Sequence, residues 1–428
     1  MQDESSRLTL FRATCSEIRG SEKHLVVGID VGKEKHHAFY GTPKGKTFRR
    51  KFVFQNRRAD FEDLRALARD LAATHGLEKI VFGLEPTGVY HKPLLEYLIR
   101  QEEHVVIVSN VAVKRNRELL DGRWDKNDVT DAANVADLLG QARCLYADDP
   151  QEPLRQLREL VGTRARLGKQ EHRERMRIRN NLVAQYFPEL ECGYTQGGGD
   201  ALVLRVLSEC FDPVEIGALS FEQFWKTIVL PRWGKSQHQR AEAIWQASKT
   251  SVGCTVSAPV RAEAGNLVRR LTALRADLQE VEREIASVAK TLAGYASVIS
   301  IPGVGPVISA MILAAIGDPN RFSHPRQVLR LAGMDLCASR SGKSSDRVVP
   351  KISKQGKAML RYGLVQAARL APIHHPAVRA YFARLLVGRD QERGIRLKMH
   401  VKLASKLLVI AWTLMKRGQT FDPKKFTG

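Results

Sequence analysis

The sequence predicts an α/β domain at the N-terminus, then a long helical region and a basic, mainly α-helical C-terminal domain. Short apolar runs rich in β-branched residues alternate with helical patterns over residues 24–145, which predicts a sheet flanked by helices. Over residues 267–292, apolar residues recur at steps of four and three, as in coiled coils. Residues 321–428 contain 23 Lys or Arg against 5 Asp or Glu, and so carry most of the net charge of +22.

The first 145 residues are expected to form a flexible extension and one domain. Residues 1–23 are polar and make up the extension. Two hairpin-like connections followed by strand–helix alternation predict a mixed sheet with flanking helices over residues 24–145, as in ribonuclease-H-like domains. The expected strands lie near residues 25–31, 36–41, 51–55, 79–85 and 104–109, and the expected helices near 58–74, 88–102 and 128–140.

Four acidic residues occupy positions that suit a divalent-metal nuclease. Asp30 and Glu85 each end an apolar strand-like run, and Asp128 and Asp131 lie on one face at the start of a helical stretch. A single acid at a strand end or in the first turn of a helix is usually structural. Four acids that converge on one sheet edge instead suit Mg²⁺ or Mn²⁺, which bind hard oxygen ligands. Two such ions can clamp the attacking and leaving oxygens of a phosphodiester.

The middle of the chain, residues 146–293, is predicted to be helical, with an insertion near 190–258 that has no clear pattern. The apolar seam over 267–292 favours a coiled coil within or between chains. A suitable antiparallel partner is the helical stretch at 153–186. The seam consists of Leu267, Leu271, Leu274, Leu278, Val281, Ile285, Val288 and Leu292.

The C-terminal region, residues 294–428, begins with a glycine-rich turn, Ile301-Pro302-Gly303-Val304-Gly305. A turn of this type that enters a helix resembles a helix-hairpin-helix, in which backbone N–H groups face a phosphate. A simple tight turn between helices is the alternative.

Composition narrows the class of protein. The net charge of +22 and the pI near 9.9 predict a polyanionic partner. The six cysteines lack CxxC spacing, which argues against a zinc site and a disulfide framework. Neither a signal peptide nor a membrane span is expected. We therefore expect a cytoplasmic protein without membrane association.

Several short motifs together resemble the DEDD-type transposases of the insertion-sequence family numbered one hundred and ten. Their order and spacing cover both ends of the chain and leave out the segment near 190–258. The motifs are GID at 28–30, EPTG at 85–88, KNDVTDA at 126–132, IPGVG at 301–305, GDPNRF at 317–322, LAG at 331–333, SG at 341–342 and ISKQGK at 352–357.

The resemblance implies a transposase or site-specific recombinase that cleaves and rejoins DNA through a 5′-phosphoserine intermediate. The metal-binding tetrad is then Asp30, Glu85, Asp128 and Asp131, in a resolvase-like domain. The nucleophile falls on Ser341, which precedes Gly342. This chain has one extra residue between that serine and the ISK motif, so Ser339, Ser344 and Ser345 stay open as alternatives.

The resemblance also implies a prokaryotic protein that acts at the nucleoid, and it implies partners. A noncoding guide RNA is expected to pair with double-stranded donor and target DNA. The protein is expected to work as a homo-oligomer, a dimer or a tetramer. Basic residues around the serine are the expected nucleic-acid contacts, namely Arg340, Lys343, Arg347, Lys351, Lys354 and Lys357.

Two other classes of protein compete with this interpretation. A metal-dependent nuclease or junction resolvase would use water as the nucleophile and would leave free 5′-phosphate ends. A non-catalytic nucleic-acid-binding protein would not need all four acids, and all four are present.

Overall fold

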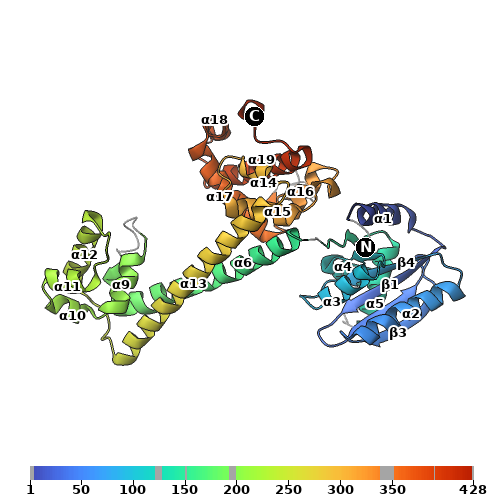
Figure 1. The fold of residues 1–428 in the computed structure, drawn as a ribbon, viewed down its shortest axis with the longest axis horizontal. Coiled ribbons are helices and arrows are strands. Elements are labelled where there is room, and N and C mark those ends of the chain that lie inside the picture. The colour runs from blue at the N-terminus through green and yellow to red at the C-terminus, as the bar shows by residue number, and fades with distance from the viewer. Residues whose placement is uncertain are drawn as a thin grey trace, which may run out of the picture. The chain divides into compact units, whose positions relative to one another are not determined.

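The computed structural model describes residues 4–120, 128–149, 152–191, 199–337, 351–389 and 391–426. These residues form two compact units, Met1–Gln151 and Glu152–Gly428 (Figure 1). The three-domain division expected from the sequence, with boundaries near 145 and 293, stays a prediction. In the part of the chain that the structure describes, none of the helices has the length and hydropathy needed to cross a bilayer.

A six-stranded mixed sheet forms the centre of the first unit, in the order β3-β2-β1-β4-β5-β6. β1 is antiparallel to β2 and parallel to β4, and β5 is parallel to β4. The mixed sheet predicted from the sequence is therefore confirmed, while its ribonuclease-H-like assignment stays a prediction. The strands are β1 (His24–Val31), β2 (His36–Gly41), β3 (Thr47–Phe54), β4 (Lys79–Glu85), β5 (Val105–Ile107) and β6 (Leu145–Tyr146).

Helices cover both faces of this sheet, and alternate residues of β1 face opposite layers. Leu25, Val27 and Ile29 pack against α2 (Arg58–Thr74) and α3 (Lys92–Arg100). On the other face, Val26 packs with residues of α5 (Asp128–Gly140), and α4 (Asn110–Leu120) is paired with α5. Both faces of the central strands are buried, which explains their near-continuous apolar sequence.

The extension expected over residues 1–23 differs in the structure, where α1 (Glu4–Glu17) is a helix. Leu8 and Thr14 of α1 are buried, and so is Ile18, which directly follows the helix. The guanidinium of Arg7 donates a hydrogen bond to the carbonyl of Ala147 at 2.6 Å. The apolar residues of this segment are few but lie at helical spacing, so packing against the sheet orders a stretch whose composition is polar.

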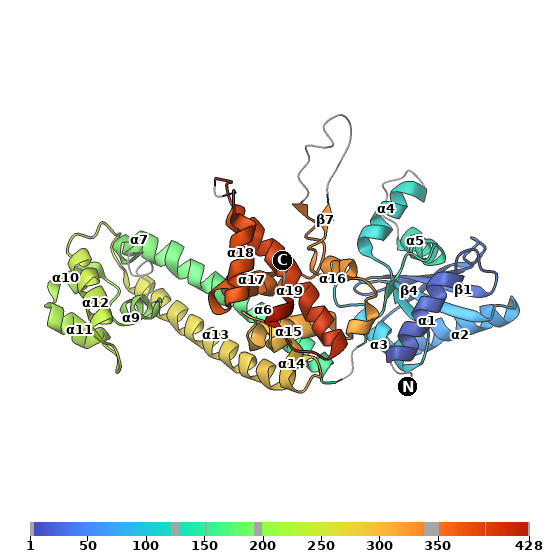
Figure 2. The same cartoon turned by 90° about the horizontal axis from the view of Figure 1, so that it is seen from above.

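In the second unit, two long helices, α6 (Leu154–Arg177) and α13 (Ala258–Lys290), pair within the chain (Figure 2). The two helices are antiparallel, because residues later in α6 form ion pairs with residues earlier in α13. Arg164 bonds to Glu282 at 2.7 Å, Glu171 contacts Arg275 at 3.1 Å, and Arg177 contacts Glu263 at 3.8 Å. The predicted seam supplies the contact, although coiled-coil packing as such stays a prediction.

The insertion near 190–258 is a small helical module with its own core. Its apolar residues pack with the π-helical segment η1 (Ile178–Val183), which continues α6, and with the first turns of α13. The irregular sequence pattern has a simple cause, because the helices are short and turns separate them. The module comprises α7 (Ala184–Tyr186), η2 (Pro188–Glu191), α9 (Ala201–Glu209), α10 (Pro213–Ala218), α11 (Phe221–Ile228) and α12 (Lys235–Ser248).

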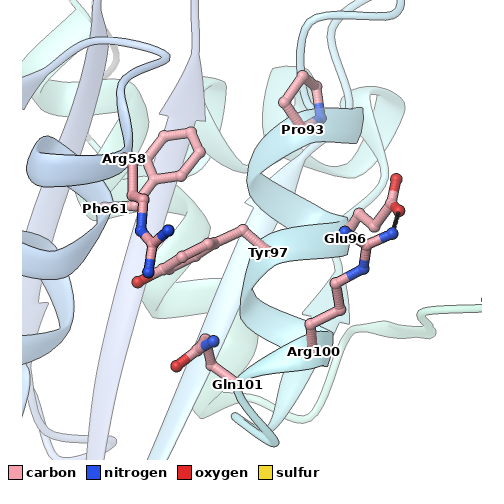
Figure 3. Close-up of a pocket in the computed structure, with 7 residues that line it drawn as sticks. All are labelled: Arg58, Phe61, Pro93, Glu96, Tyr97, Arg100 and Gln101. Carbon is pink, nitrogen blue, oxygen red and sulfur yellow. Dashed lines mark hydrogen bonds and ion pairs between the residues drawn. The ribbon is translucent and has the colours of Figure 1, made fainter.

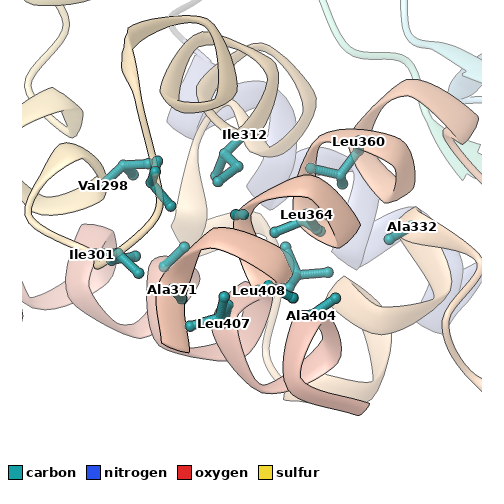
Figure 4. Close-up of a cluster of buried hydrophobic side chains, with 14 of the residues drawn as sticks. Val298, Ile301, Ile312, Ala332, Leu360, Leu364, Ala371, Ala404, Leu407 and Leu408 are labelled. Carbon is teal, nitrogen blue, oxygen red and sulfur yellow. The ribbon is translucent and has the colours of Figure 1, made fainter. Parts of the chain in front are cut away.

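A second core lies at the opposite end of the α6–α13 pair, and here the chain is mainly helical, as predicted. Residues such as Ile312, Leu364 and Leu408 meet from three different helices (Figure 4). The elements are α14 (Tyr295–Ile299), α15 (Pro306–Ile316), η3 (Pro319–Arg321), α16 (Pro325–Ala332), β7 (Leu336–Cys337), β8 (Lys351–Ile352), α17 (Ala358–His374), α18 (Pro376–Leu386), α19 (Ile395–Arg417) and η5 (Pro423–Lys425).

Candidate active site

Asp30 and Glu85 lie side by side at the carboxyl ends of adjacent parallel strands. They are register partners in the β1–β4 ladder, so their backbones are about 4.8 Å apart, the normal spacing of paired strands. Both side chains are half-buried. Because side chains alternate across a sheet, Asp30 shares a face with Gly28 and Glu85 shares a face with Gly83. That face is the one covered by α5.

Two glycines bring α5 directly onto this face. A Cβ at Gly28 would lie 2.3 Å from the carbonyl oxygen of Ala132 and 2.5 Å from the amide nitrogen of Ala136. A Cβ at Gly83 would lie 3.0 Å from Cδ2 of Leu139. The helix backbone therefore rests on β1 with no room for a side chain between them. This packing requires the glycine of the GID motif. In the sequence, that glycine is marked only as part of the motif.

The direction of α5 places its acidic N-terminus at the end of β1 that carries Asp30. The helix C-terminus lies near the start of β1, because Gly140 contacts Pro43 in the turn between β2 and β3. The first turn, with Asp128 and Asp131, therefore points to the carboxyl ends of β1 and β4. The side chain of Asp128 lies outside the described residues.

Asp131 is buried, with 1% of its surface exposed, and forms an ion pair with Arg117 of α4. The distance from Nη2 of Arg117 to Oδ1 of Asp131 is 2.6 Å. Arg117 therefore balances one of the four predicted acids. Sequence analysis missed Arg117, since an arginine ahead of the KNDVTDA motif has no pattern that marks it as a partner.

An amide network fixes α4 against α5 beside this ion pair. The side-chain nitrogen of Asn116 donates to Oδ1 of Asn134 at 2.5 Å and to Oδ2 of Asp137 at 2.7 Å. Asn134 in turn donates to the carbonyl of Val113 at 2.8 Å. Buried and fully bonded amides hold one relative position of two helices, so the position of Arg117 opposite Asp131 is set by packing.

These residues suit a divalent cation in part. Asp30 and Glu85 provide paired carboxylates of the type that Mg²⁺ binds, and α5 directs two more acids to the same edge. Among the residues that the structure describes, however, no three acidic, histidine or cysteine side chains are close enough to enclose a metal ion. The cation remains an expectation based on the acids and their order.

Burial lowers the pKa of two histidines near these motifs. They are His36, at the start of β2, and His91, which follows the EPTG motif. In both, burial disfavours the charged imidazolium.

The basic motifs of the second unit meet at the base of the loop that carries the predicted serine. Residues 338–350 lie outside the described residues, and with them Ser341, its alternatives, and Arg340, Lys343 and Arg347. The two segments that flank this loop, β7 and β8, pair as short antiparallel strands. The LAG motif precedes β7 in the chain, and the ISKQGK motif begins with Ile352 of β8.

Two glycines lock these motifs together. A Cβ at Gly356 would lie 2.4 Å from the amide nitrogen of Gly333, and a Cβ at Gly333 would lie 2.8 Å from the carbonyl carbon of Lys354. Gly333 also has φ of +64°, a conformation that glycine adopts most readily. The carbonyl of Ala332 accepts a hydrogen bond from Arg361 at 2.8 Å. We call this arrangement the glycine clasp, and it explains why LAG and ISKQGK occur as a pair.

The predicted basic contacts that the structure describes take different positions in this clasp. Lys351, Lys354 and Lys357 are all exposed. Lys357 differs in that its ammonium group donates to the carbonyl of Ala315 at 3.2 Å and its amide donates to the carbonyl of Leu331 at 2.7 Å. Lys357 is thus engaged in holding α17 against the clasp. Arg361, which sequence analysis did not select, has the same role.

The glycine-rich turn at 301–305 joins α14 to α15. Gly303 has φ of +80°, and a Cβ there would lie 2.5 Å from the carbonyl of Ala367 in α17. Gly305, which caps α15, has open space on its Cα. One glycine therefore serves packing and the other leaves the first turn of α15 accessible. A helix-hairpin-helix role for this turn stays a prediction.

The first unit also contains a cavity of about 460 Å³ between α2 and α3 (Figure 3). Arg100 and Glu96 in its wall pair with each other. None of the predicted site residues lines it. The lining residues are Arg58, Phe61, Pro93, Glu96, Tyr97, Arg100 and Gln101.

Comparison with known proteins identifies the class of this protein. A transposase model for DEDD-type IS110 enzymes matches residues 27–188. A model described as the transposase IS116/IS110/IS902 family matches residues 295–383. These ranges contain the predicted acids and the clasp respectively, and leave out most of the inserted module.

Individual relatives agree with the family models. An IS110 insertion-element protein of 43.6 kDa from Streptomyces coelicolor is 24% identical over 94% of this chain and 97% of its own length. An IS116 protein of 44.8 kDa from Streptomyces clavuligerus is 24% identical over 93% and 96%. The transposase for insertion sequence element IS1111A from Coxiella burnetii is 31% identical over 33% of this chain and 38% of its own.

These matches identify a DNA transposase. The chain belongs to the IS110/IS116/IS902 transposase family, as its motifs predicted.

Proposed function

We propose that this transposase exchanges DNA strands through a 5′-phosphoserine formed on Ser341, with a divalent cation held by Asp30, Glu85, Asp128 and Asp131. The observation that supports this most is the in-register pair of Asp30 and Glu85 on the face where the acidic N-terminus of α5 lies. Mg²⁺ or Mn²⁺ bound there would lower the pKa of a hydroxyl nucleophile and stabilise charge on the phosphate.

The residues of the chain then have distinct roles. The oxygen of Ser341 forms a bond to the phosphorus, the bond to the 3′-oxygen breaks, and that oxygen takes up the serine proton. The reverse step joins a 3′-hydroxyl of another strand and frees the serine. The energy of the phosphodiester is kept in the phosphoserine, so the exchange needs no ATP. The glycine clasp supports the two short strands that lead into the serine loop.

The decisive experiment traps the covalent intermediate. A duplex with a nick close to the cleavage site should leave a denaturant-resistant protein–DNA adduct, because the cleaved fragment diffuses away. Ser341→Ala should lose the adduct and recombination but keep DNA binding, since the charge of the loop is unchanged. Mass spectrometry of the adduct identifies the serine. An adduct on Ser339, Ser344 or Ser345 would move the assignment, and free 5′-phosphate ends without any adduct would support a water-dependent nuclease.

We also propose that a noncoding RNA guides the enzyme to donor and target DNA. The resemblance to the family and the basic C-terminal region support this. Exposed Lys351 and Lys354 at the base of the serine loop are suited to phosphate contacts. Binding through phosphates should weaken by orders of magnitude between about 50 and 200 mM salt. Recombination that proceeds equally well in RNA-free protein would contradict the guide.

Assembly of at least two copies is the last part of this proposal. Leu267, Leu271 and Ile285 of the apolar seam are buried, but Leu274 and Leu278 between them are only half-buried. A second copy that packs there would cover both. Leu274→Asp with Leu278→Asp should abolish assembly and recombination together, as measured by sedimentation. A wild-type protein that is monomeric with and without nucleic acid would contradict this.

A further inference from the structure

The inserted module has a continuous row of aromatic rings on its surface. Ring centroids are 6.2 Å apart for Trp233 and Trp225, 5.1 Å for Trp225 and His238, and 4.9 Å for His238 and Phe221. Phe221 continues the row to Trp245 at 5.7 Å. His238 is exposed and the other four rings are half-buried. We call these five residues the aromatic row.

Positive charge surrounds the aromatic row. The segment 221–249, which contains the whole row, has five Lys or Arg against two acids, Glu222 and Glu242. Lys226, Arg232 and Lys235 are exposed, and within the described chain none of them has an ion-pair partner. At the far end, the ammonium of Lys249 lies 3.4 Å from the ring centre of Trp245. Partly exposed rings with flanking cations match the needs of bases and phosphates together.

The turn that joins α11 to α12 holds Arg232 in an unfavourable backbone conformation. The amide of Trp233 bonds to the carbonyl of Leu230 at 3.2 Å, with Pro231 between them, as in a type II turn. The third position of such a turn favours glycine, yet this chain has Arg232 there with φ of +81°. A non-glycine residue in such a conformation indicates a functional constraint at this position.

We propose that the aromatic row binds unpaired nucleotides of RNA, with bases stacked on the rings and phosphates on Arg232, Lys226 and Lys235. Stacking requires bases that are not already paired in a duplex, and folded RNA offers these in its loops and bulges. The choice of RNA rests on the guide RNA of the proposed function. The stacking itself rests only on the rings and cations of this module, which lies almost wholly outside both family models.

Photo-crosslinking of the full chain tests this site. The probe is a 12-nucleotide oligouridine RNA containing 5-iodouridine, and mass spectrometry locates the crosslinked residues. Locating them separates this site from other basic surfaces. We expect crosslinks within residues 221–249. His238→Ala should lower their yield about tenfold, in line with the loss of one base–aromatic stack, while His238→Phe should retain it.

Arg232→Gly is the second variant, because it removes a cation and gives the turn the residue that its conformation favours. We expect an unchanged or higher Tm together with a severalfold lower crosslink yield. Lys290→Gln is the matched control, because it removes a cation at the C-terminal end of α13, outside the inserted module. It should change neither the Tm nor the crosslink yield. Full yield in Arg232→Gly and His238→Ala, or no crosslinks within 221–249, would overturn the proposal.

Two further outcomes separate this proposal from the guide-RNA function. If the matching oligothymidine DNA crosslinks as well as the RNA, the site binds single strands in general and the assignment to RNA is wrong. If wild-type recombination needs no RNA, the proposed guide fails, whereas crosslinks to oligouridine still report on the aromatic row.

Discussion

The two parts of the chain that carry the predicted chemistry are built in different ways. Asp30 lies in an eight-residue strand and Glu85 in a seven-residue strand. Both strands are paired along their length and buried on both faces. The segment with the predicted serine lies outside the described residues, and the strands on either side of it, β7 and β8, have only two residues each. Metal ligands need a fixed mutual geometry, and sheet register supplies it. The serine segment depends on a local clasp, so different substitutions should damage the two parts.

The largest expected effect is on the rate of DNA strand cleavage. It distinguishes the acid at the end of β4 from the acid just before its start. Glu85→Gln should lower strand cleavage about a thousandfold or more, because removal of a metal-binding carboxylate costs several kcal/mol of transition-state stabilisation. Glu78→Gln is the matched control, since Glu78 is an exposed acid just before β4 that pairs with Lys23. It should cleave normally. Cleavage kinetics with Mg²⁺ measure both, and equal rates in wild type and Glu85→Gln would place the metal site elsewhere.

The ion pair beside the acids gives the next effect. Arg117→Met leaves Asp131 buried without its counter-charge, which should cost about 3 kcal/mol of unfolding free energy. If Asp131 also binds a cation, Mg²⁺ should raise the Tm of this variant more than that of wild type, because binding to the folded state adds stability. Thermal unfolding with and without Mg²⁺ makes the measurement. Equal shifts in both proteins would assign Asp131 a purely structural role.

Glycine substitutions compare the two constructions directly. Gly28→Ala forces β1 and α5 apart and should destabilise the first unit by about 1–3 kcal/mol, with loss of cleavage. Gly333→Ala should instead disturb the clasp and reduce adduct formation while the first unit stays intact. Gly265→Ala, in α13 with open space around it, is the control and should stabilise slightly. Both variants should form less adduct, so denaturant unfolding of the first unit distinguishes them. Equal destabilisation of that unit in Gly28→Ala and Gly333→Ala would refute the comparison.

The smallest effect concerns a thiol pair in the first unit. The sulfurs of Cys15 and Cys144 are 3.9 Å apart, and a hydrogen bond from Cys144 lowers the pKa of Cys15 from 9.0 to about 7. The thiolate of Cys15 should therefore form as the pH rises through about 7. Alkylation of Cys15 should increase over that range and level off above it, as followed by peptide mass spectrometry. In Cys144→Ala, which removes the donor, the midpoint should move upward, and an unchanged midpoint would contradict the hydrogen bond.

The sequence alone determined the elements with strong local patterns. Strand runs that end in Asp30 and Glu85, the helix that starts at Asp128 and the seam on α13 were all predicted, because apolar periodicity is a property of neighbouring residues. The polar composition of residues 1–23 predicted no order, yet a few apolar residues at helical spacing were enough for α1 to pack on the sheet. Order there depends on contacts with distant residues, which composition does not report.

Only the tertiary structure decided which of the motif residues serve chemistry and which serve packing. Gly28, Gly333 and Gly356 are close-contact positions, and that is visible only when the opposing backbone is in place. Arg117 pairs with Asp131, and Lys357 helps to hold α17. Both contacts join segments that no sequence motif links, so the sequence alone does not predict them. The aromatic row is the same case, since its rings come from two helices and the turn between them. A periodic pattern encodes one element, whereas a contact between elements depends on the whole fold.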